Sequence, residues 1–95
     1  MPLFVLSCIY KPNSLALRMA TREAHFAYAR EHGQGIRFGG PFLDAKGDMA
    51  GSLIILEAED LEAAKAFNRA DPYTLAGLFE SVDVRPFRVT FGALP

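Results

Sequence analysis

Two segments of this chain are apolar at almost every position, and they constrain the fold more than any other feature. LFVLSCIY covers residues 3 to 10, and SLIILEA covers residues 52 to 58. A strand with one face in water would carry a polar residue at every second position, and neither segment does. Both segments therefore predict central strands of a sheet that is covered on both faces.

A long helix and a short strand are expected between these two segments. After the break at KPNS, Asn13 or Ser14 would cap a helix that runs from about 15 to 32. Gly33 would end that helix, as glycine commonly does. The next segment, GIRFGGPF, alternates weakly and predicts a short strand that its Gly-Gly-Pro ends, before the polar hairpin loop LDAKGDMAG.

The second half of the chain predicts one more helix and one more strand. Asp60 would cap a helix over LEAAKAFNRA, and Pro72 disfavours helical geometry at the residue before it. A short helical turn over YTLAGLF would lead into the last strand, SVDVRPFRVTF. The apolar phase of that strand changes at Pro86, which predicts a bulge or a break in pairing there.

The resulting order is βαββαβ, a ferredoxin-like α+β pattern in one domain over residues 1–95. Its two helices would cover one face of a four-stranded antiparallel sheet and leave the other face bare. Because the central strands are apolar on both sides, that second face needs a cover, and a second copy supplies one. We expect a homodimer with its sheets stacked face to face, or a higher oligomer.

Composition excludes several function classes. The formal net charge is −1 and the basic residues are scattered, so no nucleic-acid partner is expected. We expect no membrane partner either, because no apolar run approaches the length that spans a bilayer. One cysteine and no H-E-x-x-H pattern argue against a metal site, and no cofactor motif is present. The start of the chain lacks the features of a signal peptide, so a cytoplasmic location is expected.

A basic stripe on the first helix is the first candidate for chemistry. At about 100° per residue, Arg18, Arg22 and His25 fall within an arc of roughly 60°. The rest of that helix surface is mostly apolar or alanine. The stripe is either a solvated face with an ordinary surface histidine or one wall of a functional site.

Asp71, in the segment ADPY, is the expected partner of His25. It follows the second helix, and Pro72 holds it extended, so it would lie at the edge of the helical layer. A carboxylate that accepts a hydrogen bond from one imidazole nitrogen fixes the tautomer and leaves the other nitrogen as base or acid. The alternative is an Asx turn, in which Asp71 bonds only its own backbone.

Other residues have a structural and a functional interpretation. Arg22 would bind an anionic group or pair with a nearby acid, and Tyr73 would border the ligand or pack under the short helix. Ser52 would donate a hydrogen bond to a ligand; it lacks the G-x-S-x-G frame of a nucleophile. Gly40 and Pro41 would end a strand or bring the backbone close to the ligand.

Several motifs together resemble the YciI-like, or YCII-related, family. They are RxxH at 22–25, GGP at 39–41, GS at 51–52, LEAAKAF, and ADPY followed by AGLFESVDVRPF. The match covers almost the whole chain in order. The resemblance implies a dimeric α+β barrel and an active site built on His25 and Asp71. It also implies small cyclic or aromatic ligands.

These expectations lead to a cofactor-independent, lyase- or isomerase-like enzyme acting on a small cyclic compound. His25 would transfer a proton in isomerisation, elimination or lactone opening, with Asp71 orienting it and Arg22 favouring an anionic or enolic substrate. The alternatives are a dimer that binds the same ligand without turnover, and an interaction module in which the His–Asp pair is structural.

Overall fold

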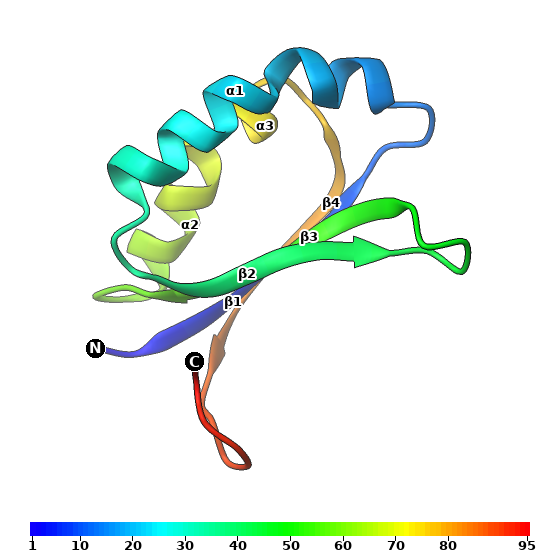
Figure 1. Ribbon diagram of the computed structural model, residues 1–95. Coiled ribbons are helices and arrows are strands. Elements are labelled where there is room, and N and C mark those ends of the chain that lie inside the picture. Colours follow the sequence, from blue (N-terminus) through cyan, green and yellow to red (C-terminus); the bar gives the residue numbers. More distant parts are fainter.

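The computed structural model describes all residues from 1 to 95 as one antiparallel sheet with helices on one of its faces (Figure 1). The strand order is β2-β3-β1-β4, so β2 and β4 form the edges. In chain order the elements are β1 Leu3–Tyr10, α1 Leu15–His32, β2 Ile36–Leu43, β3 Met49–Glu57, α2 Leu61–Ala70, α3 Pro72–Leu75 and β4 Phe79–Phe87. The ferredoxin-like α+β fold is confirmed, with α3 as the short helix expected after α2.

The two apolar segments are the central strands β1 and β3, and their alternate residues build the core under the helices. Phe4 and Leu6 are almost completely buried, and Leu6 is only 1% exposed. They pack with Leu56 of β3 and with Ala64 on the inner face of α2. This core fixes α2 against the sheet and leaves α1 to lie over β2 and β3 (Figure 1).

The intervening residues of the same strands form a second apolar face that no helix covers (Figure 1). Val5 pairs with Ile55, and Ser7 pairs with Leu53, so these side chains share the face away from the helices. The sequence pattern predicted strands that are covered on both faces. Within one chain, the helices cover one face of these strands and leave the other face open.

The second strand is longer than expected, and the prediction that Gly-Gly-Pro ends it is wrong. β2 continues to Leu43, with Gly39 paired to Ile54 and Pro41 paired to Ser52. Pro41 cannot donate to a neighbouring strand, but β2 is an edge strand that pairs only with β3. A Cβ at Gly39 would lie 3.0 Å from the Leu53 carbonyl oxygen, so glycine allows the strands to approach there.

The last strand is shorter than expected, and the predicted bulge at Pro86 is wrong. Pro86 pairs with Phe4 in unbroken register, and the register shift lies instead between Ile9 and Tyr10 of β1. Phe87 faces the open side of the sheet by regular alternation, opposite to Val82 and Val84, and Val89 and Phe91 lie beyond the strand, which ends at Phe87. Pro86 is tolerated because β4 is also an edge.

The two long helices begin differently: the side-chain cap expected for α1 is absent, and the one expected for α2 is present. Ser14 occupies the position before α1, but its side chain makes no capping hydrogen bond, and Asn13 has a positive φ of 55°. Asp60 caps α2 as expected, because its side chain accepts a hydrogen bond from the Ala63 amide at 2.8 Å. None of the helices is long and apolar enough to cross a membrane.

Candidate active site

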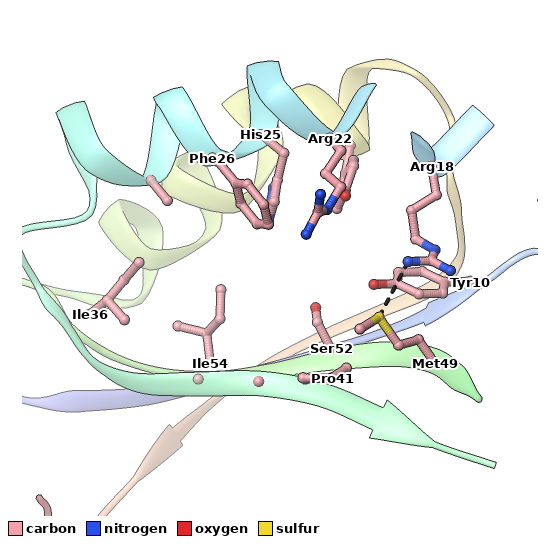
Figure 2. A pocket seen from close by; sticks show the side chains of 14 residues that line it. Tyr10, Arg18, Arg22, His25, Phe26, Ile36, Pro41, Met49, Ser52 and Ile54 are labelled. Atoms are coloured by element: carbon pink, nitrogen blue, oxygen red, sulfur yellow. Dashed lines mark hydrogen bonds between the residues drawn. The ribbon is translucent and has the colours of Figure 1, made fainter. Parts of the chain in front are cut away.

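A cavity of about 300 Å³ lies between α1 and the helix-facing side of β2 and β3 (Figure 2). Its wall includes side chains from α1, β1, β3 and α3 and the Gly-Gly-Pro segment of β2. Among the residues expected from the sequence, those that line the cavity are Arg18, Arg22, His25, Gly40, Pro41, Ser52 and Tyr73. Asp71 lies behind His25 and is not part of the wall.

The imidazole of His25 and the carboxylate of Asp71 are hydrogen-bonded. His25 Nδ1 lies 2.8 Å from Asp71 Oδ1, and Asp71 is only 4% exposed. A carboxylate accepts, so the neutral imidazole donates from Nδ1 and carries its lone pair on Nε2. No protein group is hydrogen-bonded to Nε2, so this nitrogen is free to accept a proton at the cavity wall.

Asp71 also makes the hydrogen bond to nearby backbone that was expected from the sequence as its alternative role. The same Oδ1 accepts a hydrogen bond from the Tyr73 amide at 2.9 Å, which caps the start of α3. The backbone at Asp71 is extended, with φ −61° and ψ 130°, where Pro72 begins the new helix. One carboxylate oxygen therefore both caps the start of α3 and anchors the histidine of α1.

The ring of Tyr73 holds His25 from a second side. The two ring centroids are 3.9 Å apart and the planes differ by 9°, so the rings are stacked. Tyr73 is 5% exposed and makes an edge contact with Tyr10. With Asp71 at Nδ1 and Tyr73 on the ring face, the imidazole has little freedom to rotate.

The phenols of the cavity are hydrogen-bond donors at neutral pH. Burial is the largest cause that raises the pKa of Tyr10 and of Tyr73 above the usual value of 10.0. The nearby Arg18 guanidinium opposes this rise in both pKa values without reversing it. Figure 2 shows the Tyr10 hydroxyl on the cavity side of β1.

The two arginines of the basic stripe extend from α1 toward the sheet (Figure 2). The Arg22 guanidinium carbon lies 4.8 Å from the centroid of the Phe26 ring, and Arg22 has no carboxylate partner. Arg18 Nη1 donates to the Met49 sulfur at 3.3 Å, and its guanidinium carbon lies 5.3 Å from the Tyr10 centroid. The expected alternative for Arg22, an ion pair with an acid, is absent.

The sheet side of the cavity presents a hydroxyl and bare backbone. Ser52 points from β3 toward α1 (Figure 2), and Pro41 lies opposite it on β2. Gly40 pairs with Leu53 on the other sheet face, and a Cβ there would meet nothing within 4 Å. Gly40 therefore borders the cavity with its backbone only.

Six further wall residues were not singled out from the sequence. They are Tyr10, Phe26, Ala29, Ile36, Met49 and Ile54. Strand alternation carries a signal for Tyr10, because it continues the inward phase of Leu6 and Cys8. Met49 carries none, since the strand was expected to begin after it. No group of three or more His, Cys, Asp or Glu side chains lies together as a metal site would require.

Comparison with known proteins gives both family and structural relatives. The model of the YCII-related domain matches residues 2–88. Protein YciI of Escherichia coli O6:H1 is 38% identical over 97 residues, which covers 94% of this chain and 99% of the relative. An uncharacterised protein of Haemophilus influenzae is 34% identical over 88 residues, covering 84% of this chain and 90% of its own.

Two solved structures resemble this chain, one in both sequence and fold and the other in fold alone. The 5-chloro-2-hydroxyhydroquinone dehydrochlorinase (TftG) of Burkholderia phenoliruptrix AC1100, solved with 2,5-dihydroxybenzoquinone, is 37% identical with a TM-score of 0.82. That similarity covers 95% of each chain. Rv0793 of Mycobacterium tuberculosis is 16% identical with a TM-score of 0.55, over 98% of this chain and 99% of that one. The second similarity concerns the fold alone.

Proposed function

The chain belongs to the YCII-related domain family, and within that family we propose that it is a cofactor-independent enzyme that transfers protons on small hydroxylated ring compounds. One observation carries the proposal. His25 Nδ1 is bonded to a buried carboxylate at 2.8 Å, while the ring borders a cavity of about 300 Å³ with Nε2 unpartnered. A base needs this arrangement of a fixed tautomer, a free nitrogen and space for a substrate.

The proposed step begins with His25 Nε2 taking a proton from an O–H or C–H group of the ring. Asp71 stabilises the imidazolium that forms, as it already accepts from Nδ1. The released electron pair moves into the ring. His25 then returns the proton to another ring atom, which is an isomerisation. When that atom is the chlorine-bearing carbon, this carbon becomes tetrahedral, and loss of a second hydroxyl proton to Nε2 then expels chloride, so that HCl is eliminated and a quinone forms. Neither outcome consumes an oxidant or a reductant.

The dehydrochlorinase relative supports an elimination. The substrate in its name is a chlorinated, hydroxylated ring, and the atoms removed in a dehydrochlorination are those of HCl. With 37% identity over 95% of both chains, a related reaction class is a reasonable proposal for this chain. The donors that surround the cavity, among them Ser52 and Tyr10, suit the oxygens of such a ring.

The experiment uses two readouts. Purified protein is incubated anaerobically with 5-chloro-2-hydroxyhydroquinone, and free chloride is measured; in parallel, ring-proton exchange of unchlorinated hydroxylated rings in D₂O is followed by NMR. We expect His25→Gln to lower both rates by about 10² to 10⁴-fold, the usual contribution of a general base. His32→Gln is the matched control, because His32 is exposed at the end of the same helix.

Chloride release and exchange at the buffer rate would reject the enzyme. If ring compounds nevertheless bound, the non-catalytic ligand-binding dimer would be the better description. Rates that survive His25→Gln unchanged would assign the proton transfer to another group.

We also propose that two copies pair through the open sheet face. Several apolar side chains share that face in the strand registers, and no helix covers them. They are Leu3, Val5, Ile9, Phe38, Phe42, Leu53, Ile55 and Phe87. The polar side chains Asp83 and Arg85 of β4 border this apolar surface on the same face. An apolar surface of this kind is unusual on a monomer, and an identical face is complementary to it.

A further inference from the structure

We propose that the cavity contains a second anion subsite at Arg18, so that its ligand is a small ring with two anionic groups. One group would lie beside Arg22, next to His25, and the other would lie against Arg18, one helical turn away. The inference rests on the proposed function for the location of the ligand and adds its charge and the residue that selects for it.

The cavity has an excess of positive charge that the protein does not neutralise. Arg18 and Arg22 line it, and no acidic side chain does. Of the other five arginines, three pair with carboxylates, Arg37 with Glu57, Arg69 with Glu62 and Arg85 with Asp83, and the two without an acidic partner, Arg30 and Arg88, are exposed and outside the cavity. Two unpaired guanidinium groups over a largely apolar hollow favour an anionic occupant, because charge-assisted bonds to carboxylates or phenolates are among the strongest available.

The present partners of Arg18 are weak and easily exchanged. Its Nη1 donates to the thioether sulfur of Met49 at 3.3 Å, and its plane lies over the Tyr10 ring at 5.3 Å (Figure 2). A thioether is a weak acceptor, so an anionic oxygen would displace it with a net gain. The contact with Tyr10 holds the guanidinium near the cavity without using its donors.

There is also room for a substituent at this end of the cavity. A second hollow of about 370 Å³ lies beside the first and shares Tyr10, Arg18 and Met49 with it. Lys11 borders this hollow and adds positive charge. The one carboxylate there, Asp44, is already bonded to the amides of Lys46 and Asp48 in the hairpin turn.

The spacing of the two arginines limits the ligand to a compact dianion. Residues four apart on a helix lie on the same side, with Cβ atoms about 5–6 Å from each other. Two acidic groups on one six-membered ring span a comparable distance, so each can bind one guanidinium, whereas a single carboxylate would have to share its two oxygens between both. The 2,5-dihydroxybenzoquinone found with the dehydrochlorinase has two acidic hydroxyls on one ring, as this inference requires of a ligand.

The test compares two inert probes, benzoate with one carboxylate and isophthalate with two, by calorimetric titration. We expect the wild-type protein to bind isophthalate more tightly than benzoate. Arg18→Leu should weaken isophthalate binding roughly tenfold or more, as loss of a bond to a charged group does, and change benzoate binding by less than about twofold. Arg30→Leu, which removes the same charge from an exposed site on α1, should weaken neither by more than about twofold.

Three results would overturn the subsite. Isophthalate could bind wild type no more tightly than benzoate, Arg18→Leu could weaken both probes equally, or Arg30→Leu could match Arg18→Leu. Circular dichroism of each variant establishes that it is folded before its affinity is interpreted. The probes do not react, so selectivity for isophthalate without any proton transfer would keep the subsite and reject the enzyme. Proton transfer without that selectivity would reject the subsite alone.

Discussion

The imidazole of His25 and the carboxylate of Asp71 lie 2.8 Å apart although 46 residues separate them in the chain. The same oxygen of Asp71 accepts the Tyr73 amide at 2.9 Å, and the Tyr73 ring stacks on the His25 ring. The three residues therefore form one unit, in which the turn between α2 and α3 sets the orientation of a side chain on α1.

The first prediction concerns the tautomer of His25. Asp71 accepts from Nδ1, so ¹⁵N NMR should find the neutral wild-type imidazole protonated at Nδ1. Asp71→Ala removes the acceptor and should shift His25 toward the Nε2–H tautomer, which free histidine prefers. Exposed His32 is the internal reference and should not change. A His25 tautomer that is the same in both folded proteins would show that Asp71 does not orient it.

The second prediction separates the ring of Tyr73 from its hydroxyl. Tyr73→Phe keeps the stack on His25 and should change the free energy of unfolding by less than about 1 kcal/mol. Tyr73→Ala opens a cavity under α1 and should cost about 3 kcal/mol or more. Urea unfolding measures both. Equal losses in the two variants would assign the stabilisation to the hydroxyl instead of the ring.

The third prediction concerns alkaline stability. Burial is the main cause that raises the pKa of the Cys8 thiol from 9.0 to about 11, and the charge of Asp71 adds to it. The folded protein therefore holds this proton more tightly than the unfolded chain. The resulting stabilisation is fully present below pH 9 and is lost as the pH rises toward 11. A shift of this size corresponds to at most about 3 kcal/mol.

Cys8→Ala should therefore flatten the fall in stability between pH 9 and pH 11. The slope is compared, because the substitution also lowers stability at every pH by removing a buried side chain. The Cys8 thiolate also raises the pKa of Tyr10, so the difference between the slopes reports the thiol together with its effect on that phenol. Identical slopes would contradict the raised pKa of Cys8.

The fourth prediction tests the open sheet face. Sedimentation at micromolar concentration should give a dimer for the wild-type protein. Val5→Glu and Phe38→Glu each place a charge on that face and should shift the protein to monomer. Leu75→Glu is the control, because Leu75 is 74% exposed on α3 and lies away from the sheet. A wild-type monomer, or a dimer that survives both substitutions, would reject this interface.

The order of elements could be predicted from the sequence because it depends on local patterns. Continuous apolar runs specify β1 and β3, helical spacing and Gly33 specify α1, and Asp60 caps α2 through a hydrogen bond three residues away. The prediction that His25 contacts Asp71 used the position of Asp71 at the end of one helix and of His25 near the middle of the other. The elements themselves follow from residues close in the chain or from a fixed period, whereas the contact of His25 with Asp71 followed from the expected packing of two helices and from the family resemblance.

The strand ends and the composition of the cavity were decided by tertiary structure. Pro41 and Pro86 look like strand breakers in sequence, but both lie on edge strands where one side needs no donor. Met49 meets Arg18, 31 residues away, only because of how β3 extends under α1. Such contacts follow from strand order and register, which long-range packing sets and no local pattern encodes.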